Sequence, residues 1–364
     1  MLSIKEVARL TGLSTATVSR ALDPRWSSRV RPETREKILA VCDSADFRPR
    51  MAGRSFVTGK SFKVGFISGD PAGDFGNPLF GRFLQGASFR LQASGYSLLL
   101  LSAPHTPEQD TKVVDFLRSG VADAYILGSA LVKGRAADAV RKCRAPVLML
   151  ERQQEFPDAL IIRRDPRPAF RQIWENVPAR WNGKVAFCAM DSALYRYAAV
   201  RECAPEGFSL PLVKLGAGKN FMEIRNNARD AAAKIATRLG KYKLLWCSSD
   251  LAALGVKDAL EQKGLRAGRD FFLVGFDNME ETTGFEAPPF LSTVDSCWEG
   301  LGNQAAAMIL DSLEGRTTPS PAEFPLRYIP RASFPGDPLS EARAKAENGR
   351  RYEKLTPQHE RITE

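Results

Sequence analysis

Apolar side chains recur at helical intervals along the first 45 residues of the chain. Ser3 and Glu6 have the spacing of a capping box, which predicts a short helix that ends at Gly12. Ser14 offers a hydroxyl to the free amides of a second helix, and a third helix fits residues 32–45. Helix, glycine-containing turn and helix together predict a helix-turn-helix unit.

The second helix has one apolar stripe and one outer face. The residues on the outer face are Thr15, Ala16, Ser19 and Arg20. In a helix-turn-helix unit the N-terminal part of the second helix enters the major groove of DNA, so this face is a candidate DNA-binding surface. An ordinary structural corner between two helices is the alternative.

The distribution of charge favours DNA binding over a structural corner. Residues 1–60 hold 12 Lys and Arg against 6 Asp and Glu, whereas residues 61–364 hold 40 against 36. More than half of the net charge of +10 therefore lies in about a sixth of the chain. Positive charge concentrated in this way is typical of a module that binds phosphates.

After residue 60, short apolar runs alternate with helical patterns. This alternation is typical of parallel β-sheets that are covered by helices on both faces. The length of 364 residues and the hydrophobic content of 44% allow several globular domains. Nine strands are too many for one compact sheet, so the pattern predicts two α/β lobes. The predicted strands are residues 64–67, 98–101, 124–127, 147–150, 160–162, 185–189, 212–215, 244–247 and 273–276.

Seven stretches of the sequence resemble the LacI/GalR (lactose-repressor/galactose-repressor) family of bacterial transcription regulators. The most specific is IKEVARLTGLSTATVSRAL at residues 4–22. The others are RPETREKIL at 31–39, FRPRMAGRSFVTGK at 47–60, NPLF at 77–80, SDLAALG at 249–255, FLVGFD at 272–277 and PPFLSTV at 288–294. The resemblance implies a sequence-specific DNA-binding regulator, favours a repressor, and implies control by a small-molecule, sugar-like effector.

The resemblance also implies the domain organisation. An all-α helix-turn-helix headpiece would precede a periplasmic-binding-protein-like α/β effector domain of two doubly wound parallel-sheet lobes, with the effector in the cleft between them. The expected boundaries are 1–46 for the headpiece, 47–61 for a hinge helix, 62–330 for the effector-binding and dimerisation domain and 331–364 for a tail whose composition predicts disorder. Lobe 1 is expected at 62–162 and 291–322 and lobe 2 at 163–290 and 323–330, with chain crossings near 162–164, 288–292 and 320–325.

The family resemblance implies particular DNA contacts for the second helix. Thr15 and Ala16 match the two positions that set sequence preference in the family, and both side chains are short. Arg20 matches a position that contacts guanine through O6 and N7, and a phosphate contact is the alternative. The residues expected to cap the helix or bind phosphate are Ser14, Thr17 and Ser19.

A hinge helix over residues 47–61 would supply a second DNA contact. Its family counterpart pairs with the same helix of a second subunit in the minor groove and inserts an apolar side chain between base pairs. Arg54 is expected to bind phosphate, and Phe56 stands where the family usually has Leu. The alternative for Phe56 is packing on the effector domain. Because the hinges pair, the resemblance implies a homodimer on a pseudo-palindromic double-stranded operator.

Candidate effector-binding residues follow from the resemblance alone. Arg196 matches an arginine that binds hydroxyl or carboxylate groups, and Asp277 matches an aspartate that accepts hydrogen bonds from the effector. Phe221 matches a ring that lies against a sugar or base, and Phe80 belongs to the corner NPLF of the first lobe. Ser249 stands where the family usually has Asn, so the identity of the ligand stays open.

Three of these residues have a structural alternative. Asp277 can cap a loop, and Phe80 and Phe221 can be ordinary core residues. A run of arginines is typical of a solvated edge of a lobe, but it can also line the cleft and favour an anionic ligand. The run comprises Arg163, Arg164, Arg167 and Arg171.

The sequence gives little support for catalysis, for a metal or cofactor, or for a membrane span. Residues 216–219 lack the spacing of a phosphate-binding loop, and neither His105 nor His359 lies in an acid–base or metal motif. The six cysteines contain no C-x-x-C pair, and no apolar run approaches the ~20 residues of a membrane span. We therefore expect a cytoplasmic protein that is not an enzyme. A cytoplasmic sugar-binding or sugar-processing protein of the same body plan is the alternative.

Overall fold

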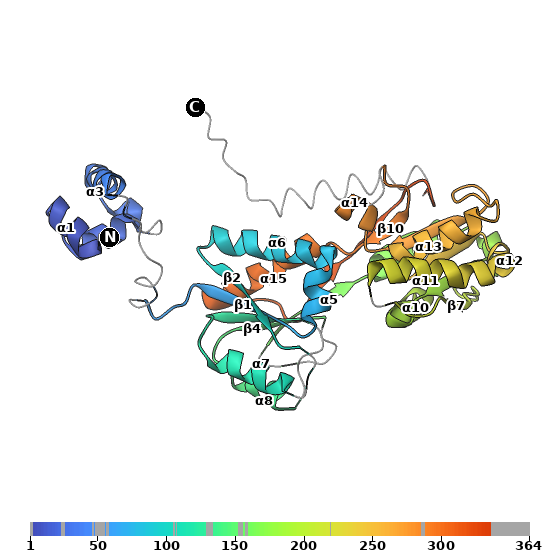
Figure 1. Ribbon diagram of the computed structural model, residues 1–364, viewed down its shortest axis with the longest axis horizontal. Coiled ribbons are helices and arrows are strands. Elements are labelled where there is room, and N and C mark those ends of the chain that lie inside the picture. The colour runs from blue at the N-terminus through green and yellow to red at the C-terminus, as the bar shows by residue number, and fades with distance from the viewer. Residues whose placement is uncertain are drawn as a thin grey trace. The chain divides into compact units, whose positions relative to one another are not determined.

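The computed structural model describes residues 3–22, 26–45, 47, 55, 58–104, 106, 108–128, 134–151, 156, 159–218, 220–284 and 288–335. The chain divides into two compact units (Figure 1). Residues 1–62 and 120–123 form the first, and residues 63–119 and 124–364 form the second. The first contains the headpiece, and the second contains both lobes of the effector domain.

The headpiece is a three-helix unit, as the helical spacing predicts. Its elements are α1 (Ile4–Thr11), α2 (Thr15–Leu22), η1 (Ser27–Arg29) and α3 (Pro32–Ser44). The backbone amide of Glu6 donates to Ser3 Oγ, and the amide of Ser3 donates to the Glu6 carboxylate, so the predicted capping box is present. Gly12 ends α1 with a φ of 69°. One apolar core joins the three helices and comprises Val7, Ala8, Val18, Ala21, Ile38, Cys42 and Phe47.

Lobe 1 is built on a six-stranded parallel sheet in the order β11-β5-β4-β3-β1-β2. Its strands are β1 (Lys63–Ser68), β2 (Ser97–Ser102), β3 (Ala124–Leu127), β4 (Val147–Leu150), β5 (Leu160–Asp165) and β11 (Ala322–Pro325). Its helices are α5 (Pro71–Gly76), α6 (Pro78–Ala93), α7 (Gln109–Arg118), α8 (Gly134–Lys142) and α15 (Trp298–Leu313). Helices α6 and α15 meet at Gly86 and Gly302, where an added Cβ would lie about 2 Å from a backbone oxygen of the other helix.

Lobe 2 has a second six-stranded sheet in the order β12-β10-β9-β8-β6-β7, parallel except for β12. Its strands are β6 (Val185–Ala189), β7 (Leu212–Lys214), β8 (Leu244–Cys247), β9 (Phe272–Phe276), β10 (Ser292–Asp295) and β12 (Arg327–Ile329). Its helices are α9 (Arg167–Glu175), η2 (Ala179–Trp181), η3 (Asp191–Ala193), α10 (Leu194–Glu202), α11 (Phe221–Lys234), α12 (Ala236–Leu239), α13 (Asp250–Glu261) and α14 (Met279–Thr283). The two sheets confirm the predicted fold of two doubly wound lobes.

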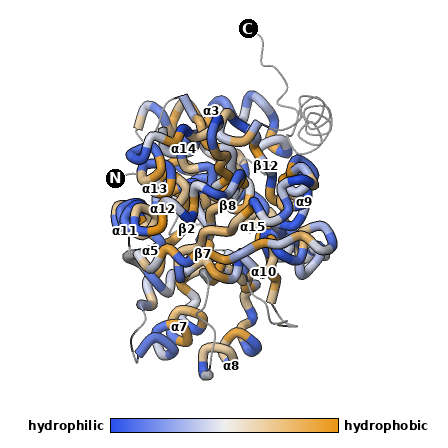
Figure 2. Tube along the Cα trace, turned by 90° about the vertical axis from the view of Figure 1, so that its right-hand side faces the viewer, coloured by the Kyte–Doolittle hydropathy of each residue, from blue (hydrophilic) through white to orange (hydrophobic). Residues whose placement is uncertain are grey.

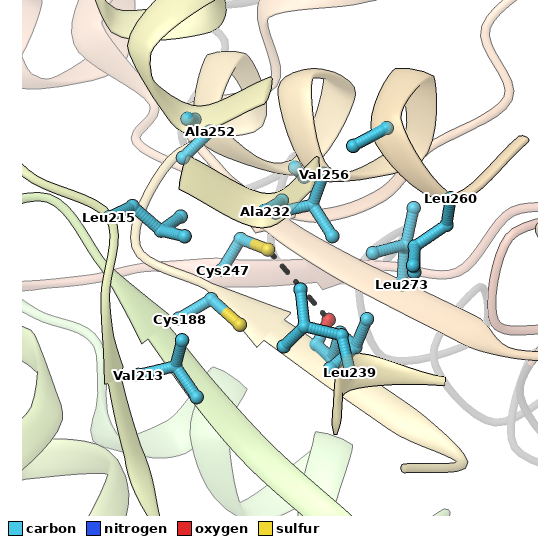
Figure 3. Packing of buried hydrophobic residues seen from close by; sticks show 14 of the residues in the cluster. Cys188, Val213, Leu215, Ala232, Leu239, Cys247, Ala252, Val256, Leu260 and Leu273 are labelled. Atoms are coloured by element: carbon cyan, nitrogen blue, oxygen red, sulfur yellow. Dashed lines mark hydrogen bonds between the residues drawn. The ribbon is translucent and has the colours of Figure 1, made fainter. Parts of the chain in front are cut away.

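Lobe 2 has one hydrophobic core against α9 and α10 and a second core between its sheet and the helices α11 and α13. Strand β8 is apolar throughout, whereas α11 alternates between hydrophobic and hydrophilic residues along its length (Figure 2). Cys188 and Cys247 are registered neighbours on β6 and β8, and both point into the second core beside Val213 and Leu239 (Figure 3). Burial raises the pKa of Cys247 well above its ordinary value, so its thiol stays protonated and unreactive.

The chain crosses between the lobes a few residues later than predicted. Strand β5 stays in the sheet of lobe 1 as far as Asp165, and β11 does so as far as Pro325. Residues 292–295, which were expected in lobe 1, form strand β10 and pair with β9 in lobe 2. Each crossing follows the carboxyl end of a strand, so lobe 1 comprises residues 63–165 and 298–325, and lobe 2 begins at 166.

The expected tail boundary at residue 331 is also too early. Ser333 and Phe334 are buried, and Ser333 Oγ donates to the Leu273 carbonyl and accepts from the Ser292 amide. The phenyl ring of Phe334 packs on Trp181 and Phe272. Lobe 2 therefore continues to residue 334, and residues 336–364 lie outside the described part of the chain. No helix of the described residues is both long and apolar enough to cross a membrane.

Candidate DNA-binding and effector sites

The outer face of α2 is open to solvent. Ser14, Thr15, Ala16, Ser19 and Arg20 are exposed, and Thr17 is half-buried. Val18 and Ala21, on the opposite side of the same helix, are fully buried in the headpiece core. The six candidate DNA-binding residues of the second helix therefore lie at its surface, on a scaffold that a buried core holds rigid.

Ser14 caps this helix. Its Oγ accepts a hydrogen bond from the Thr17 amide at 3.1 Å, and the two hydroxyl groups lie 2.9 Å apart. Before it, the Leu13 amide donates to the Ala8 carbonyl, which fixes the turn after Gly12. Because these bonds fix the start of α2, Ser14 positions the exposed residues that follow it.

The hinge is mostly outside the described residues. Arg54 and Phe56 both fall in this part, as does most of the predicted helix at 47–61. At the end of the hinge, the amides of Ser61 and Phe62 donate to the two carboxylate oxygens of Asp123 at 2.7 and 2.9 Å. Asp123 therefore holds the chain where it enters the first strand of the effector domain.

In lobe 2 the structure brings Arg196 and Asp277 together. Nη2 of Arg196 lies 3.6 Å from Oδ1 of Asp277, and the two side chains are only 14% and 16% exposed. Nη1 of Arg196 donates to the Ser248 carbonyl, and the guanidinium lies 3.8 Å from the centre of the Phe276 ring. We call this arrangement the lobe 2 cluster.

Burial and charge act in opposite directions on the lobe 2 cluster. Burial opposes the charged form of Arg196, but the Asp277 carboxylate and Tyr195 outweigh it, and the pKa of Arg196 lies above its ordinary value. Asp277 also accepts a hydrogen bond from Ser296 Oγ at 2.7 Å and has a φ of 108°. Asp277 therefore holds a loop while it faces Arg196. A role as a loop cap is thus compatible with a role as an acceptor for the effector.

Ser249 is the N-cap of α13, and its Oγ accepts from the Ala252 amide at 3.2 Å. The next residue, Asp250, is fully buried and was not predicted as a site residue. Its carboxylate accepts from the Met279 amide at 2.7 Å and from Thr293 Oγ1 at 2.6 Å. Asp250 therefore ties α13 to α14 and β10 beneath the lobe 2 cluster.

The two candidate aromatic residues have different surroundings. Phe80 is 4% exposed, and its ring packs against Phe66, Phe83 and Trp298 in lobe 1. Phe221 is half-buried in an apolar cluster that contains residues of both lobes. Its other members are Leu79, Ile224, Leu251, Met279 and Trp298. Phe80 thus has the surroundings of a core residue, whereas Phe221 lies where the lobes meet.

Lobe 1 carries a similar arrangement that sequence reasoning did not assemble. Nε of Arg164 donates to Oε1 of Glu151 at 2.6 Å, and the guanidinium lies 4.0 Å from the centre of the Trp298 ring. We call these three residues the lobe 1 cluster. Its arginine is 14% exposed, whereas Arg167 is 40% exposed and pairs with Asp165. The arginine run is therefore not uniformly a solvated edge.

Comparison with known sequences identifies both parts of the chain. Residues 3–50 match the family described as "Bacterial regulatory proteins, lacI family", and residues 184–334 match the "Periplasmic binding protein-like domain". The chain joins a lacI-family DNA-binding domain to a periplasmic-binding-protein-like domain. With these two domains it is a DNA-binding transcription regulator with a small-molecule effector domain.

Curated relatives match most of this chain, and the matches cover most of each relative. The HTH-type transcriptional repressor PurR of Vibrio atlanticus is 23% identical over 331 residues, which cover 87% of this chain and 93% of PurR. The HTH-type transcriptional regulator AglR of Rhizobium meliloti is 27% identical over 325 residues, which cover 85% and 88%.

Solved structures of the LacI/GalR type share the fold. The lac repressor dimer bound to operator and the anti-inducer ONPF has a TM-score of 0.71 at 20% identity, over 92% of this chain and 99% of that chain. The transcriptional regulator CelR in complex with cellobiose has a TM-score of 0.58 at 18% identity, over 92% and 100%. The likeness extends over the headpiece and both lobes.

Proposed function

We propose that this regulator is a cytoplasmic repressor that binds a pseudo-palindromic operator as a homodimer. The exposed face of α2 carries the proposal, because it presents Thr15, Ala16 and Arg20 from a rigid core. The surrounding residues 1–60 have twice as many basic as acidic side chains. Arg54 and Phe56 of the hinge are proposed to add phosphate and minor-groove contacts.

The proposed effector site lies between the lobes, with Arg196 and Asp277 as its polar centre. A paired donor and acceptor beside aromatic rings suits a ligand that carries hydroxyl groups, such as a sugar or sugar derivative. Ser249 and Phe221 flank this centre, and Phe80 supports it from lobe 1. Effector binding would change the arrangement of the lobes and bias the hinge between folded and frayed states.

The proposed activity is binding and not catalysis, in keeping with relatives that are transcription regulators. Selection from a random duplex library, with the full chain as bait, tests it directly. Recovery of a pseudo-palindrome, with affinity that falls steeply as salt rises, is the expected result. Turnover of a sugar in the absence of any selected sequence would support the sugar-processing alternative.

Arg20→Ala is expected to weaken binding to the selected operator by about 5- to 150-fold, since a bidentate guanine contact contributes about 1–3 kcal/mol. Fluorescence anisotropy with duplexes that differ at one base pair measures the effect. Arg9→Ala removes the same charge from the exposed surface of α1 and is the matched control. Equal weakening of Arg20→Ala on every duplex would assign Arg20 to a phosphate.

The homodimer has a candidate surface in lobe 1. Strand β2 lies at the edge of the sheet, and Leu100 on this strand is 47% exposed. Phe89 on the neighbouring helix α6 is 60% exposed. Exposed apolar groups beside an open strand edge are typical of an interface.

Leu100→Glu is therefore expected to raise the dimer dissociation constant by about ten- to a hundredfold, because it would bury an unpaired charge. Sedimentation velocity over a concentration series measures this. Met222→Glu, which replaces another 60% exposed side chain in lobe 2, serves as the control. A dimer that is as stable in Leu100→Glu as in the parent would place the interface elsewhere.

A further inference from the structure

Two buried donors in the lobe 1 cluster have no acceptor. Nη1 of Arg164 and Nε1 of Trp298 are both shielded from solvent, and neither has a hydrogen-bond partner among the described residues. Buried donors are costly to leave unsatisfied and are nearly always paired. Arg196 of the lobe 2 cluster, by contrast, is engaged by Ser248 and Asp277. The donors that lack an acceptor are therefore those of the lobe 1 cluster.

The geometry of the guanidinium group shows that Glu151 is not the acceptor for Nη1. In an arginine side chain, the Nε hydrogen and Nη1 lie on opposite edges of the guanidinium plane. Glu151 occupies the Nε edge at 2.6 Å, so the free Nη1 edge faces away from its carboxylate. Because the guanidinium stacks on Trp298 at 4.0 Å, the indole NH belongs to the same small region.

The charges around this region also favour a negative group. Trp298 is the first residue of α15, and no described side chain caps this 16-residue helix at its N-cap residue, Cys297. Free amides at a helix N-terminus attract anions. The acidic side chain of the same turn, Glu299, lies 3.8 Å from Arg82. Glu299 is thus paired with Arg82, and Glu151 occupies only the Nε edge of Arg164, which leaves Nη1 for an anion.

A short segment links the lobe 1 cluster to the proposed effector centre. Ser296 donates to Asp277 in the lobe 2 cluster, and Trp298, two residues later, stacks with Arg164 in the lobe 1 cluster. Trp298 also packs in the apolar cluster that contains Phe221 and Met279. The two clusters are therefore parts of one region that spans the lobes.

We propose that the effector carries an oxyanion, either a carboxylate or a phosphate, that accepts hydrogen bonds from Arg164 Nη1 and Trp298 Nε1. Its hydroxyl-bearing part reaches Arg196 and Asp277, so the ligand class is a polyhydroxylated acid or a sugar phosphate. The inference rests on the proposed function, since it specifies the ligand of the same effector site. The proposed ligand differs from a neutral sugar by a negative charge, which lobe 1 recognises.

Thermal unfolding of the full chain tests the oxyanion with simple probes. Inorganic phosphate and acetate are titrated separately against chloride at constant ionic strength. One or both are expected to raise the unfolding midpoint of the effector domain. Arg164→Gln is expected to raise the apparent Kd of the active anion about tenfold or more, since it removes a charge-assisted hydrogen bond. Trp298→Phe keeps the stacked ring but removes Nε1–H, and about a fivefold rise is expected.

Arg167→Gln is the matched control, because Arg167 lies three residues away and is paired with Asp165 at the surface. It is expected to respond like the parent, and anion binding to the headpiece is common to all four proteins. A response to acetate alone identifies a carboxylate, and a response to phosphate alone identifies a phosphoryl group. A parent that responds to neither, or a Trp298→Phe protein that responds like the parent, overturns the inference.

Operator binding is measured on the same preparations. A parent that binds the selected operator but shows no anion response overturns the oxyanion subsite and leaves the proposed function intact. A parent that binds no duplex overturns the proposed function instead.

Discussion

Deletion of residues 1–60 is expected to lower affinity for the selected operator by at least about a thousandfold, because specific DNA binding is typically at least that much tighter than non-specific binding. All candidate DNA contacts lie in these residues, and residues 63–334 contain both sheets and their cores. The remaining chain is therefore expected to unfold cooperatively. Anisotropy with a labelled operator and calorimetry of the truncated protein measure the two properties.

Val18→Asp is the control for this deletion, because it keeps the chain length and places a charge in the fully buried headpiece core. It is expected to reproduce the loss of operator binding without changing the unfolding of the effector domain. Specific binding by the truncated protein would show that the DNA-binding surface lies in the lobes.

The second large effect is expected at Asp250, under the lobe 2 cluster. Burial raises the pKa of Asp250 to about 7, partly offset by hydrogen bonds from Thr293 and Met279, while the carboxylates of Asp277 and Glu280 raise it further. The folded protein therefore holds this proton more tightly than the unfolded chain does. The stability contribution of Asp250 is full below about pH 4, falls as the pH rises to about 7, and is constant above it.

Asp250→Asn is expected to abolish this pH dependence. An amide can accept from the Met279 amide and donate to Thr293 Oγ1, so both bonds survive. Relative to the parent, the variant should gain roughly 4 kcal/mol of unfolding free energy between pH 4 and pH 8, as an order of magnitude. Asp250→Ala, which strands both partners, is expected to lose about 3–5 kcal/mol at pH 5.

Urea unfolding at several pH values measures these differences. Asp258→Asn, in the same helix but paired with Arg225 near the surface, controls for the loss of a carboxylate. A constant difference between Asp250→Asn and the parent at all pH values would show that the Asp250 proton is not held by folding.

Hydrophobic periodicity predicted the strands that a local run of apolar residues specifies. The nine predicted strands all occur, and four of them have the predicted bounds: β3, β4, β6 and β8. The three short strands β10, β11 and β12 were missed. Strand β10 contains Ser292 and Thr293, which are polar yet fully buried. The backbone carbonyls of Arg331 and Phe334 accept from Ser292 Oγ, and the Asp250 carboxylate accepts from Thr293 Oγ1. Apolar spacing cannot reveal a polar residue whose partner comes from elsewhere in the chain.

The same distinction applies to the sites. The face of α2 could be predicted because its residues are consecutive in one helix, and helical geometry alone places them outward. Arg196 and Asp277 were paired through the family resemblance, since they lie on different elements. Glu151 and Arg164 meet because β4 and β5 are neighbours in the sheet of lobe 1, and Trp298 joins them only after the chain has returned from lobe 2. No local pattern marks their association.

Chain connectivity limits how effector and operator binding can influence one another. The headpiece leads through residues 47–61 into β1 of lobe 1, whereas Arg196 and Asp277 belong to lobe 2. In the proposed effector site, a change at Arg196 and Asp277 therefore reaches the headpiece only through lobe 1. The crossing between β10 and α15 is suited to transmit this change, because Ser296 and Trp298 engage opposite lobes within three residues. We therefore expect that a change in the backbone torsion angles between Ser296 and Trp298 alters operator binding.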